Sequence, residues 1–131
     1  MKRILLVEDN AYFMQFLKET LHARLPSIDI FEAKNGEEAL QRIEALMPDT
    51  IFTDLRLPGA NGLELTQKIK AKYPNTIVVI ITNYDLPEYR EAAYQFGADH
   101  FLSKDSFLKM INAINQKQKL EQDDSNPSGL P

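Results

Sequence analysis

The sequence predicts an α/β fold: a doubly wound, five-stranded parallel sheet with helices on both faces. Strand-like and amphipathic helical segments alternate strictly along the chain, the pattern of repeated strand–helix–strand units. The first, third and fourth strand-like segments are the most apolar, as expected of central strands buried on both faces. With 131 residues, 44% of them hydrophobic, the chain is long enough for one domain with a substantial core.

We expect the first strand over residues 3–8, which are nearly all aliphatic before Glu8. The first helix follows over residues 10–24, before Pro26. Its apolar residues recur at helical spacing: Phe13, Phe16, Leu17 and Leu21. The second strand, over residues 29–33, alternates in polarity and therefore suits an edge of the sheet.

The second helix begins after the turn Asn35-Gly36 and ends before Pro48. Its first turn carries Glu37 and Glu38, which the helix dipole favours there. Its apolar face consists of Ala39, Leu40, Ile43 and Leu46. The third strand is expected over residues 50–54, and the third helix over residues 62–72. That helix buries three apolar residues: Leu63, Leu65 and Ile69.

The fourth strand, over residues 76–82, is the most apolar segment and so belongs in the centre. The fourth helix begins near Pro87, a favoured first-turn residue, and ends at Gly97, a typical C-terminal cap. A fifth strand over residues 99–103 precedes a fifth helix over residues 106–120, for which Asp105 is the expected N-cap. The inward residues of this helix are Phe107, Leu108, Ile111 and Ile114.

Polar residues that can bind or react end four of the five strands: Glu8, Asp9, Asp54, Thr82 and Lys104. Ligands of open parallel sheets bind beyond the carboxyl ends of the strands, so these groups are expected to converge. Two unit charges about 4 Å apart repel by roughly 4 kcal/mol at an effective dielectric near 20, and a hard divalent cation relieves that repulsion. The pattern predicts a site for a metal ion and a phosphoryl group.

Over residues 2 to about 119 the chain resembles a response regulator receiver domain. The motifs that carry the resemblance each follow a strand: Val7-Glu8-Asp9, Asp54-Leu55-Arg56-Leu57-Pro58-Gly59-Ala60-Asn61-Gly62, Ile81-Thr82 and Phe101-Leu102-Ser103-Lys104. The resemblance implies the flavodoxin-like strand order 2-1-3-4-5. It also implies a receiver domain over residues 1–119, followed over residues 120–131 by a disordered tail or the start of a linker.

The resemblance implies a magnesium site. Asp9 and Asp54 would ligate Mg²⁺ directly, Glu8 directly or through water, and the backbone carbonyl of Arg56 would complete the protein's share. Glu8 stands where the family more commonly has Asp, one methylene shorter, and this difference is expected to loosen the metal shell.

The resemblance also implies a phosphorylation switch. Asp54 would be the phosphoacceptor, with Lys104 pairing with one phosphoryl oxygen and Thr82 bonding another. Thr82 would then shift and Phe101 would change rotamer, although Phe lacks the hydroxyl often found at that position. Asp105 stands where many receivers have proline, which leaves a trans or a strained cis Lys104–Asp105 peptide as alternatives.

Arg56 and Tyr84 lie where receivers tune the lifetime of the phosphoryl group, and this bulky pair suggests slow hydrolysis. The output surface would combine the fourth helix, the fifth strand and the fifth helix, and a homodimer through that face is a further expectation. Residues expected on or beside this surface are Tyr84, Tyr89, Tyr94 and Lys109. The implied donor is a sensor histidine kinase or a phosphotransfer protein.

Composition limits the other functions. The net charge of −4 gives no general attraction to nucleic acid or to an anionic membrane. We therefore expect no membrane contact, and nucleic-acid contact only through an output domain outside this chain. No signal peptide or transmembrane segment is visible, so a cytoplasmic location is expected. The absence of cysteine excludes thiolate metal sites, and His22 and His100 lack ligand spacing and should lie at the surface.

Alternatives remain at this stage. A flavin-binding module would need a phosphate-cradling loop where this chain has Glu8-Asp9. An aspartate-based phosphohydrolase typically has a second acid where this chain has Arg56. A phosphorylation-independent receiver-like module would have lost Asp54, Thr82 or Lys104. The main alternative is the receiver half of a longer DNA-binding regulator, which the Lys104-Asp105-Ser106 stretch resembles. In the preferred interpretation the chain is no enzyme beyond its own phosphoryl transfer and autodephosphorylation.

Overall fold

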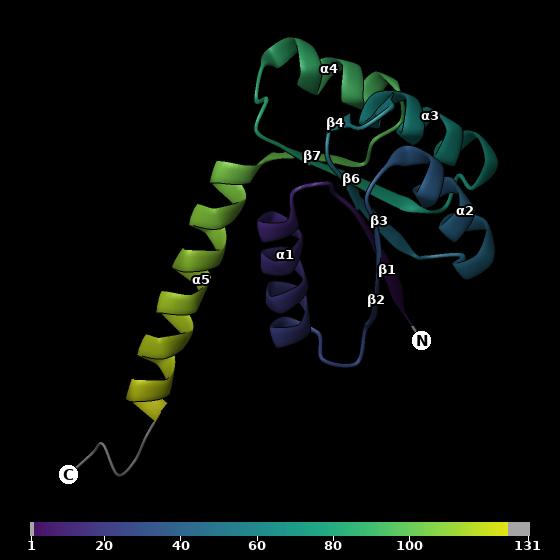
Figure 1. Ribbon diagram of the computed structural model, residues 1–131. Coiled ribbons are helices and arrows are strands. Elements are labelled where there is room, and N and C mark those ends of the chain that lie inside the picture. The colour runs from purple at the N-terminus through teal and green to yellow at the C-terminus, as the bar shows by residue number, and fades with distance from the viewer. Residues whose placement is uncertain (1, 126–131) are drawn as a thin grey trace.

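A parallel five-stranded sheet forms the centre of the computed structural model, which describes residues 2–125 (Figure 1). The strands of this sheet are β1 (Arg3–Val7), β2 (Asp29–Ala33), β3 (Thr50–Thr53), β6 (Ile77–Thr82) and β7 (His100–Ser103). Their spatial order is β2-β1-β3-β6-β7. The two short strands β4 (Arg56–Leu57) and β5 (Ala60–Asn61) pair only with each other, so the predicted order 2-1-3-4-5 of the main sheet is confirmed.

Helices cover both faces of the sheet, with α1 and α5 on one side and α2, α3 and α4 on the other (Figure 1). Their bounds are α1 (Ala11–Arg24), α2 (Gly36–Leu46), α3 (Gly62–Lys72), α4 (Pro87–Gln95) and α5 (Lys104–Ser125). In each of the first three helices an asparagine side chain accepts a hydrogen bond from the third backbone N–H beyond it. These N-caps are Asn10, Asn35 and Asn61.

Successive side chains of β1 point to opposite faces of the sheet and so belong to two different core clusters. Leu5 and Val7 pack on one face of the sheet with residues of α2 and α3, whereas Ile4 and Leu6 pack on the other with residues of α1 and α5. A third cluster lies under α4 and includes Phe101 and Leu55. The central strands are therefore buried on both faces, as their apolar sequences predict.

The start of α5 differs from the prediction. The helix begins at Lys104, so the proposed N-cap Asp105 is wrong and Asp105 lies in the first turn. The capping contact comes instead from Ser103, whose hydroxyl accepts a hydrogen bond from the backbone N–H of Ser106 at 3.0 Å. Within residues 2–125 every peptide bond is trans, including Lys104–Asp105, so the cis alternative is wrong.

Other details of the prediction also change. Helix α5 continues to Ser125, beyond the predicted end at residue 120. Leu40 and Leu108, predicted to face inward, are each 37% exposed. The rest of the predicted tail, residues 126–131, lies outside the described residues, and the domain division at residue 119 stays a prediction. No helix in the described part of the chain has the length and apolar character needed to cross a membrane.

Candidate functional site

Strand register brings the predicted site residues to one edge. Val7 is aligned with Thr53, and Thr53 with Ile80, so Glu8 and Asp54 leave adjacent strands at the same level. Thr82 ends β6 opposite Ser103 of β7, and Lys104 follows immediately. Because all five strands are parallel, these residues come together at the carboxyl edge of the sheet.

Three carboxylates form the acidic part of the site. One oxygen from each of Glu8, Asp9 and Asp54 lies within 4.8 Å of the others. Glu8 and Asp54 are buried, while Asp9 is exposed. A set of hard oxygen donors that opens to solvent through one member fits Mg²⁺, which prefers carboxylates and retains several waters. The donor set therefore fits the predicted metal.

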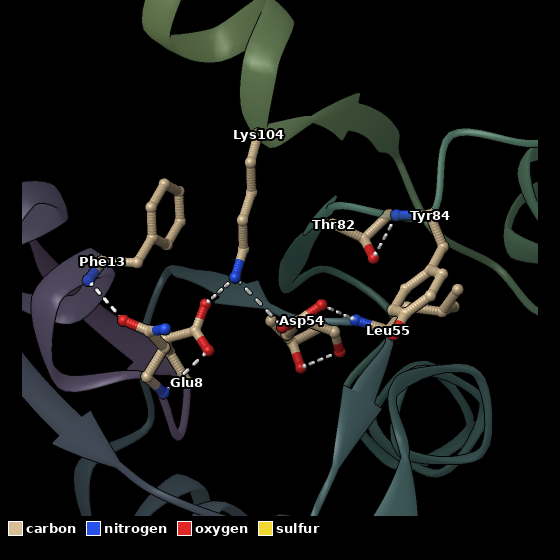
Figure 2. Close-up of polar contacts among 9 residues, drawn as sticks. Glu8, Phe13, Asp54, Leu55, Thr82, Tyr84 and Lys104 are labelled. Atoms are coloured by element: carbon tan, nitrogen blue, oxygen red, sulfur yellow. Dashed lines mark hydrogen bonds and ion pairs between the residues drawn. The ribbon is translucent and has the colours of Figure 1, made fainter.

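Lys104 joins two of these carboxylates. Its Nζ lies 2.7 Å from an oxygen of Glu8 and 3.2 Å from an oxygen of Asp54. Figure 2 shows the side chain descending from the start of α5 between the two acids. Its third neighbour is the ring of Phe13, whose centroid lies 4.4 Å from Nζ. The ammonium is thus held at the point where a phosphoryl group on Asp54 would need a counter-charge.

Burial and charge shift the ionisation of this pair. Burial raises the pKa of Glu8 above its ordinary value, and repulsion from the Asp54 carboxylate raises it further. The contact with Lys104 lowers the pKa, but not enough to cancel these two effects. Burial by itself would lower the pKa of Lys104, but its contacts with Glu8 and Asp54 outweigh burial and raise that pKa. Lys104 therefore remains an ammonium ion at neutral pH.

The backbone around Asp54 is tightly packed. The backbone N–H of Leu55 donates to Asp54 Oδ1 at 2.6 Å, and the hydroxyl of Thr53 donates to the Asp54 carbonyl at 3.0 Å. At Gly62 a Cβ atom would collide with that same carbonyl. The turn formed by β4 and β5 can fold back against Asp54 only because residue 62 lacks a side chain.

Thr82 lies on the opposite side of Asp54 from Glu8 (Figure 2). Its side chain is fully buried, and its hydroxyl accepts a hydrogen bond from the backbone N–H of Tyr84 at 3.1 Å. The hydroxyl is thereby tied to the loop between β6 and α4. Because the hydroxyl oxygen accepts in this bond, its hydrogen could be donated to an acceptor at Asp54, and a shift of Thr82 toward that acceptor would pull on the loop.

Arg56 and Tyr84 meet beside the acidic group. The guanidinium carbon of Arg56 lies 4.0 Å from the centroid of the Tyr84 ring, and Tyr84 in turn packs edge-on against Tyr89 at 6.5 Å. The pKa of Arg56 is raised above its ordinary value; its contact with Tyr89 is the largest cause, and Tyr84 is the next. The predicted pair is thus in contact, whereas the role of the Arg56 carbonyl as a metal ligand stays a prediction.

Phe101 lies away from the acidic group, packed inside the cluster under α4 and only 2% exposed. Arg90 covers it: the guanidinium carbon is 5.0 Å from the ring centroid, and Nη1 donates to the Phe101 carbonyl at 3.3 Å. Arg90 also pairs with Asp85 at 3.0 Å. This places Phe101 in an inward position, and a rotamer change on phosphorylation stays a prediction.

Sequence reasoning missed two features of the site. It placed Phe13 on the apolar stripe of the first helix without its contact to Lys104, and it did not single out Arg90. Helical spacing gives the face of a residue but no partner on another element, so neither contact had a local signal. The prediction that His22 and His100 lie at the surface is confirmed.

Comparison with known proteins agrees with this geometry. Residues 4–115 match the family described as the response regulator receiver domain. The chain is 35% identical over 115 residues to the nitrate/nitrite response regulator protein NarL of Escherichia coli, an alignment covering 86% of this chain and 53% of that protein. It is 37% identical over 107 residues to a protein-glutamate methylesterase/protein-glutamine glutaminase of Geobacillus kaustophilus, covering 79% of this chain and 30% of that protein. The chain thus spans about half or less of the length of these relatives.

Solved structures show the same fold. A CheY-like response regulator receiver domain protein from Methanospirillum hungatei superposes with a TM-score of 0.74 at 26% identity, covering 92% of this chain and 98% of that chain. A DNA-binding response regulator of the LuxR family from Staphylococcus aureus gives a TM-score of 0.76 at 26% identity, covering 88% of this chain and 98% of that chain.

Proposed function

This chain belongs to the response regulator receiver domain family, and we propose that it is a switch that accepts a phosphoryl group on Asp54 in the presence of Mg²⁺. One observation carries the proposal. The ammonium of Lys104 lies within 3.2 Å of Asp54 and 2.7 Å of Glu8, inside a cluster of three carboxylates that fits a divalent cation. A nucleophile, a counter-charge and a metal-binding acid group are therefore adjacent.

The chemistry is transfer of a phosphoryl group from a phosphohistidine of a sensor histidine kinase or a phosphotransfer protein. An Asp54 oxygen attacks phosphorus, the P–N bond of the donor breaks, and the leaving imidazole nitrogen recovers its lone pair and takes a proton. Mg²⁺ bound by Glu8, Asp9 and Asp54 would neutralise charge that develops on the transferring group. Lys104 holds its positive charge beside Asp54, and Thr82 offers a hydroxyl on the opposite side.

Phosphorylation would act on the output surface through Thr82. A phosphoryl group adds charge and acceptor oxygens at Asp54. The Thr82 side chain would shift to donate its hydroxyl to one of them, and this shift would break the bond that the hydroxyl accepts from the Tyr84 backbone N–H. The loop before α4 would then move together with Phe101. The surface formed by α4, β7 and α5 would change its affinity for an output partner or for a second copy of the chain.

The contact between Arg56 and Tyr84 supports slow loss of the phosphoryl group. Arg56 stands two residues after Asp54 and Tyr84 two residues after Thr82, and we propose that their stacked side chains hinder the water that would hydrolyse an aspartyl phosphate. We therefore propose that a variant with both side chains shortened would lose the phosphoryl group faster.

Intact mass spectrometry tests the central proposal. The protein is incubated with acetyl phosphate, with and without Mg²⁺, as wild type and as Asp54→Asn. We expect wild type to gain one phosphoryl group only with Mg²⁺, and Asp54→Asn to gain none. Asp85→Asn is the matched control because Asp85 is an exposed acid in a surface ion pair, and it should behave as wild type.

Two results would contradict the proposal: phosphoryl uptake by Asp54→Asn, or no uptake by wild type from either acetyl phosphate or a phosphorylated kinase. The first would place the acceptor elsewhere. The second would favour a phosphorylation-independent receiver-like module.

A second proposal concerns the output. The chain spans 53% of NarL, and one structural neighbour is a DNA-binding response regulator, which supports a receiver that controls an attached DNA-binding domain. DNA binding by the whole protein that is tightened by phosphorylation and lost in Asp54→Asn would support this assignment.

A further inference from the structure

We propose that Phe13 is a positioning residue for Lys104, and that its ring holds the ammonium beside Asp54 when a metal ion occupies the carboxylates. The inference rests on the proposed function, since it assigns a supporting residue to the same site. It concerns a contact between α1 and the start of α5 that no local sequence pattern predicts.

The geometry is that of a cation over an aromatic face. Lys104 Nζ lies 4.4 Å from the Phe13 ring centroid, within the roughly 6 Å over which such pairs attract. The Lys104 side chain is 9% exposed, so little water competes for the ammonium. In Figure 2 the Phe13 ring lies to the left of the lysine chain, while the carboxylates of Glu8 and Asp54 lie below the ammonium.

The three neighbours of Lys104 differ in chemistry. An ammonium has three N–H donors, and here two of its neighbours are carboxylates and one is a ring. Both carboxylates belong to the acidic group that fits Mg²⁺, and a hard cation would draw their oxygens away from Lys104. The ring offers no oxygen ligand, so it is the neighbour that metal binding leaves in place.

Phe13 is itself held firmly. Its backbone N–H donates to the N-cap Asn10 at 2.9 Å, which fixes the first turn of α1. Its ring packs against Phe16 with centroids 6.0 Å apart, and Phe16 meets Phe107 of α5 edge-on at 6.1 Å. These aromatic contacts join α1 to the first turn of α5, where Lys104 begins, so ring and ammonium are carried by helices that are packed together.

An alternative position for the ammonium lies close by. A hollow of about 380 Å³ beside the site is lined by Phe13 and Lys104 and also by the amides of Asn10 and Asn83. Without the aromatic ring, the lysine chain could turn into this hollow and be solvated there. The ring thus favours the position over Asp54 against one that is open to water.

The test compares Phe13→Leu, which removes the ring, with Phe13→Tyr, which keeps it. With Mg²⁺ and acetyl phosphate, we expect Phe13→Leu to take up the phosphoryl group about 3- to 10-fold more slowly than wild type. Phe13→Tyr should restore the rate to within about twofold. Phe31→Leu is the matched control because it removes a half-buried ring that packs on the cluster of Leu5 and Val7, on the opposite face of the sheet from Phe13, and it should retain most of the wild-type rate.

A spectroscopic readout separates positioning from stability. In NMR spectra of the protein with Mg²⁺ and without a phosphoryl donor, the Cε protons of Lys104 should be shifted upfield by the ring current of residue 13. The shift should persist in Phe13→Tyr and in the control Phe31→Leu, and it should be lost in Phe13→Leu. Circular dichroism at the same temperature verifies that all variants are folded.

The outcomes are distinguishable. An unchanged Lys104 shift and an unchanged rate in folded Phe13→Leu would overturn the inference. Phosphoryl uptake by Phe13→Tyr that is as slow as in Phe13→Leu would also overturn the inference. The loss of rate would then depend on how residue 13 packs and not on its aromatic face. A ring-dependent shift in a wild-type protein that takes up no phosphoryl group would support the placement of Lys104 by Phe13 while the proposed function fails.

Discussion

At the scale of single residues, the site depends on a balance between buried charges. Glu8 and Asp54 are both largely removed from water, and Lys104 supplies the nearest positive charge. An unpaired buried carboxylate is costly, so in the absence of a metal the lysine stabilises the acids. In the proposed function a cation would take that role, and the same lysine would become available to a phosphoryl group. One side chain would thus serve two states of the site.

Asp99 shows the same principle at the other end of the sheet. Burial by itself would raise its pKa, but hydrogen bonds from the Val78 backbone N–H and from Lys70 outweigh burial and lower it. The distances from its Oδ2 are 2.8 Å to the Val78 nitrogen and 3.0 Å to Lys70 Nζ. The charged form of Asp99 therefore ties the loop before β7 to α3 and β6.

A pH dependence of stability follows. Since the folded-state pKa lies below the ordinary value of 3.8, the Asp99 contribution is fully present above that value. It is lost as the pH falls through the lower folded-state pKa. We expect Asp99→Asn to lower the free energy of unfolding at pH 7 by about 1 kcal/mol and to have progressively less effect as the pH falls below 3.8. Urea denaturation at a series of pH values measures this difference.

The exposed acid Asp105 provides the control, because its ion pair with Lys109 lies in solvent. Asp105→Asn should change the free energy of unfolding little at pH 7. An effect of Asp99→Asn that stays constant from pH 7 until the protein is fully acid-unfolded would contradict the assigned linkage.

At the scale of elements, the loop from β3 to α3 is shaped by Gly62 as much as by Asp54. The backbone N–H of Gly62 donates to the Leu55 carbonyl at 2.6 Å, which closes the small ribbon of β4 and β5. Asn61 then caps α3, and Thr66 donates its hydroxyl to the Gly62 carbonyl at 2.6 Å. The chain reverses beside Asp54 within a few residues, and this explains the turn-forming sequence that follows Asp54.

Gly62→Ala should destabilise the protein by about 2–4 kcal/mol, because the added Cβ meets backbone that cannot move without shifting Asp54. Alanine favours helices, so helix propensity alone would predict the opposite sign. Chemical denaturation followed by circular dichroism measures the change.

Gly59→Ala is the matched comparison. Gly59 has a φ of 73°, and a Cβ atom added there would meet open space, so only backbone strain of about 1 kcal/mol is expected. If Gly59→Ala and Gly62→Ala lowered the free energy of unfolding equally, the close approach of residue 62 to the Asp54 carbonyl would not be the cause of the loss at Gly62.

At the scale of the whole molecule, the central sheet contributes side chains to two hydrophobic clusters, one on each of its faces. Leu5 and Leu6 are adjacent in β1 and fully buried, yet they belong to clusters on opposite faces. Any loss of β1 removes the support of both helical layers at once. The molecule is therefore expected to unfold as a single cooperative unit.

Truncation of either leucine tests this expectation. Leu5→Ala and Leu6→Ala should each lower the free energy of unfolding by about 2–5 kcal/mol. The transitions seen by circular dichroism and by tyrosine fluorescence should remain coincident in both. Leu25→Ala, at a site 43% exposed, should change stability by less than about 0.5 kcal/mol. Separate transitions in Leu6→Ala would show that the layer of α1 and α5 unfolds independently.

The sequence by itself determined the order of elements, the central strands and the residues at the strand ends. These follow from local rules: aliphatic runs form buried strands, and residues that end parallel strands share one edge. For this reason Glu8, Asp9, Asp54 and Lys104 could be placed together from their positions along the chain. The prediction that Asp105 is the N-cap was wrong, because the hydroxyl of Ser103, two residues earlier, accepts the capping hydrogen bond.

Only the tertiary structure decided which side chains meet across elements. The guanidinium of Arg90 in α4 lies over the ring of Phe101 in β7, and the ring of Phe13 reaches the ammonium of Lys104 from a different helix. Leu108 lies on the same helix as Phe107 but is exposed, because its surroundings depend on how α5 packs beside α1. Periodicity gives the direction of a side chain from its own element, whereas its partner is set by the packing of elements against each other.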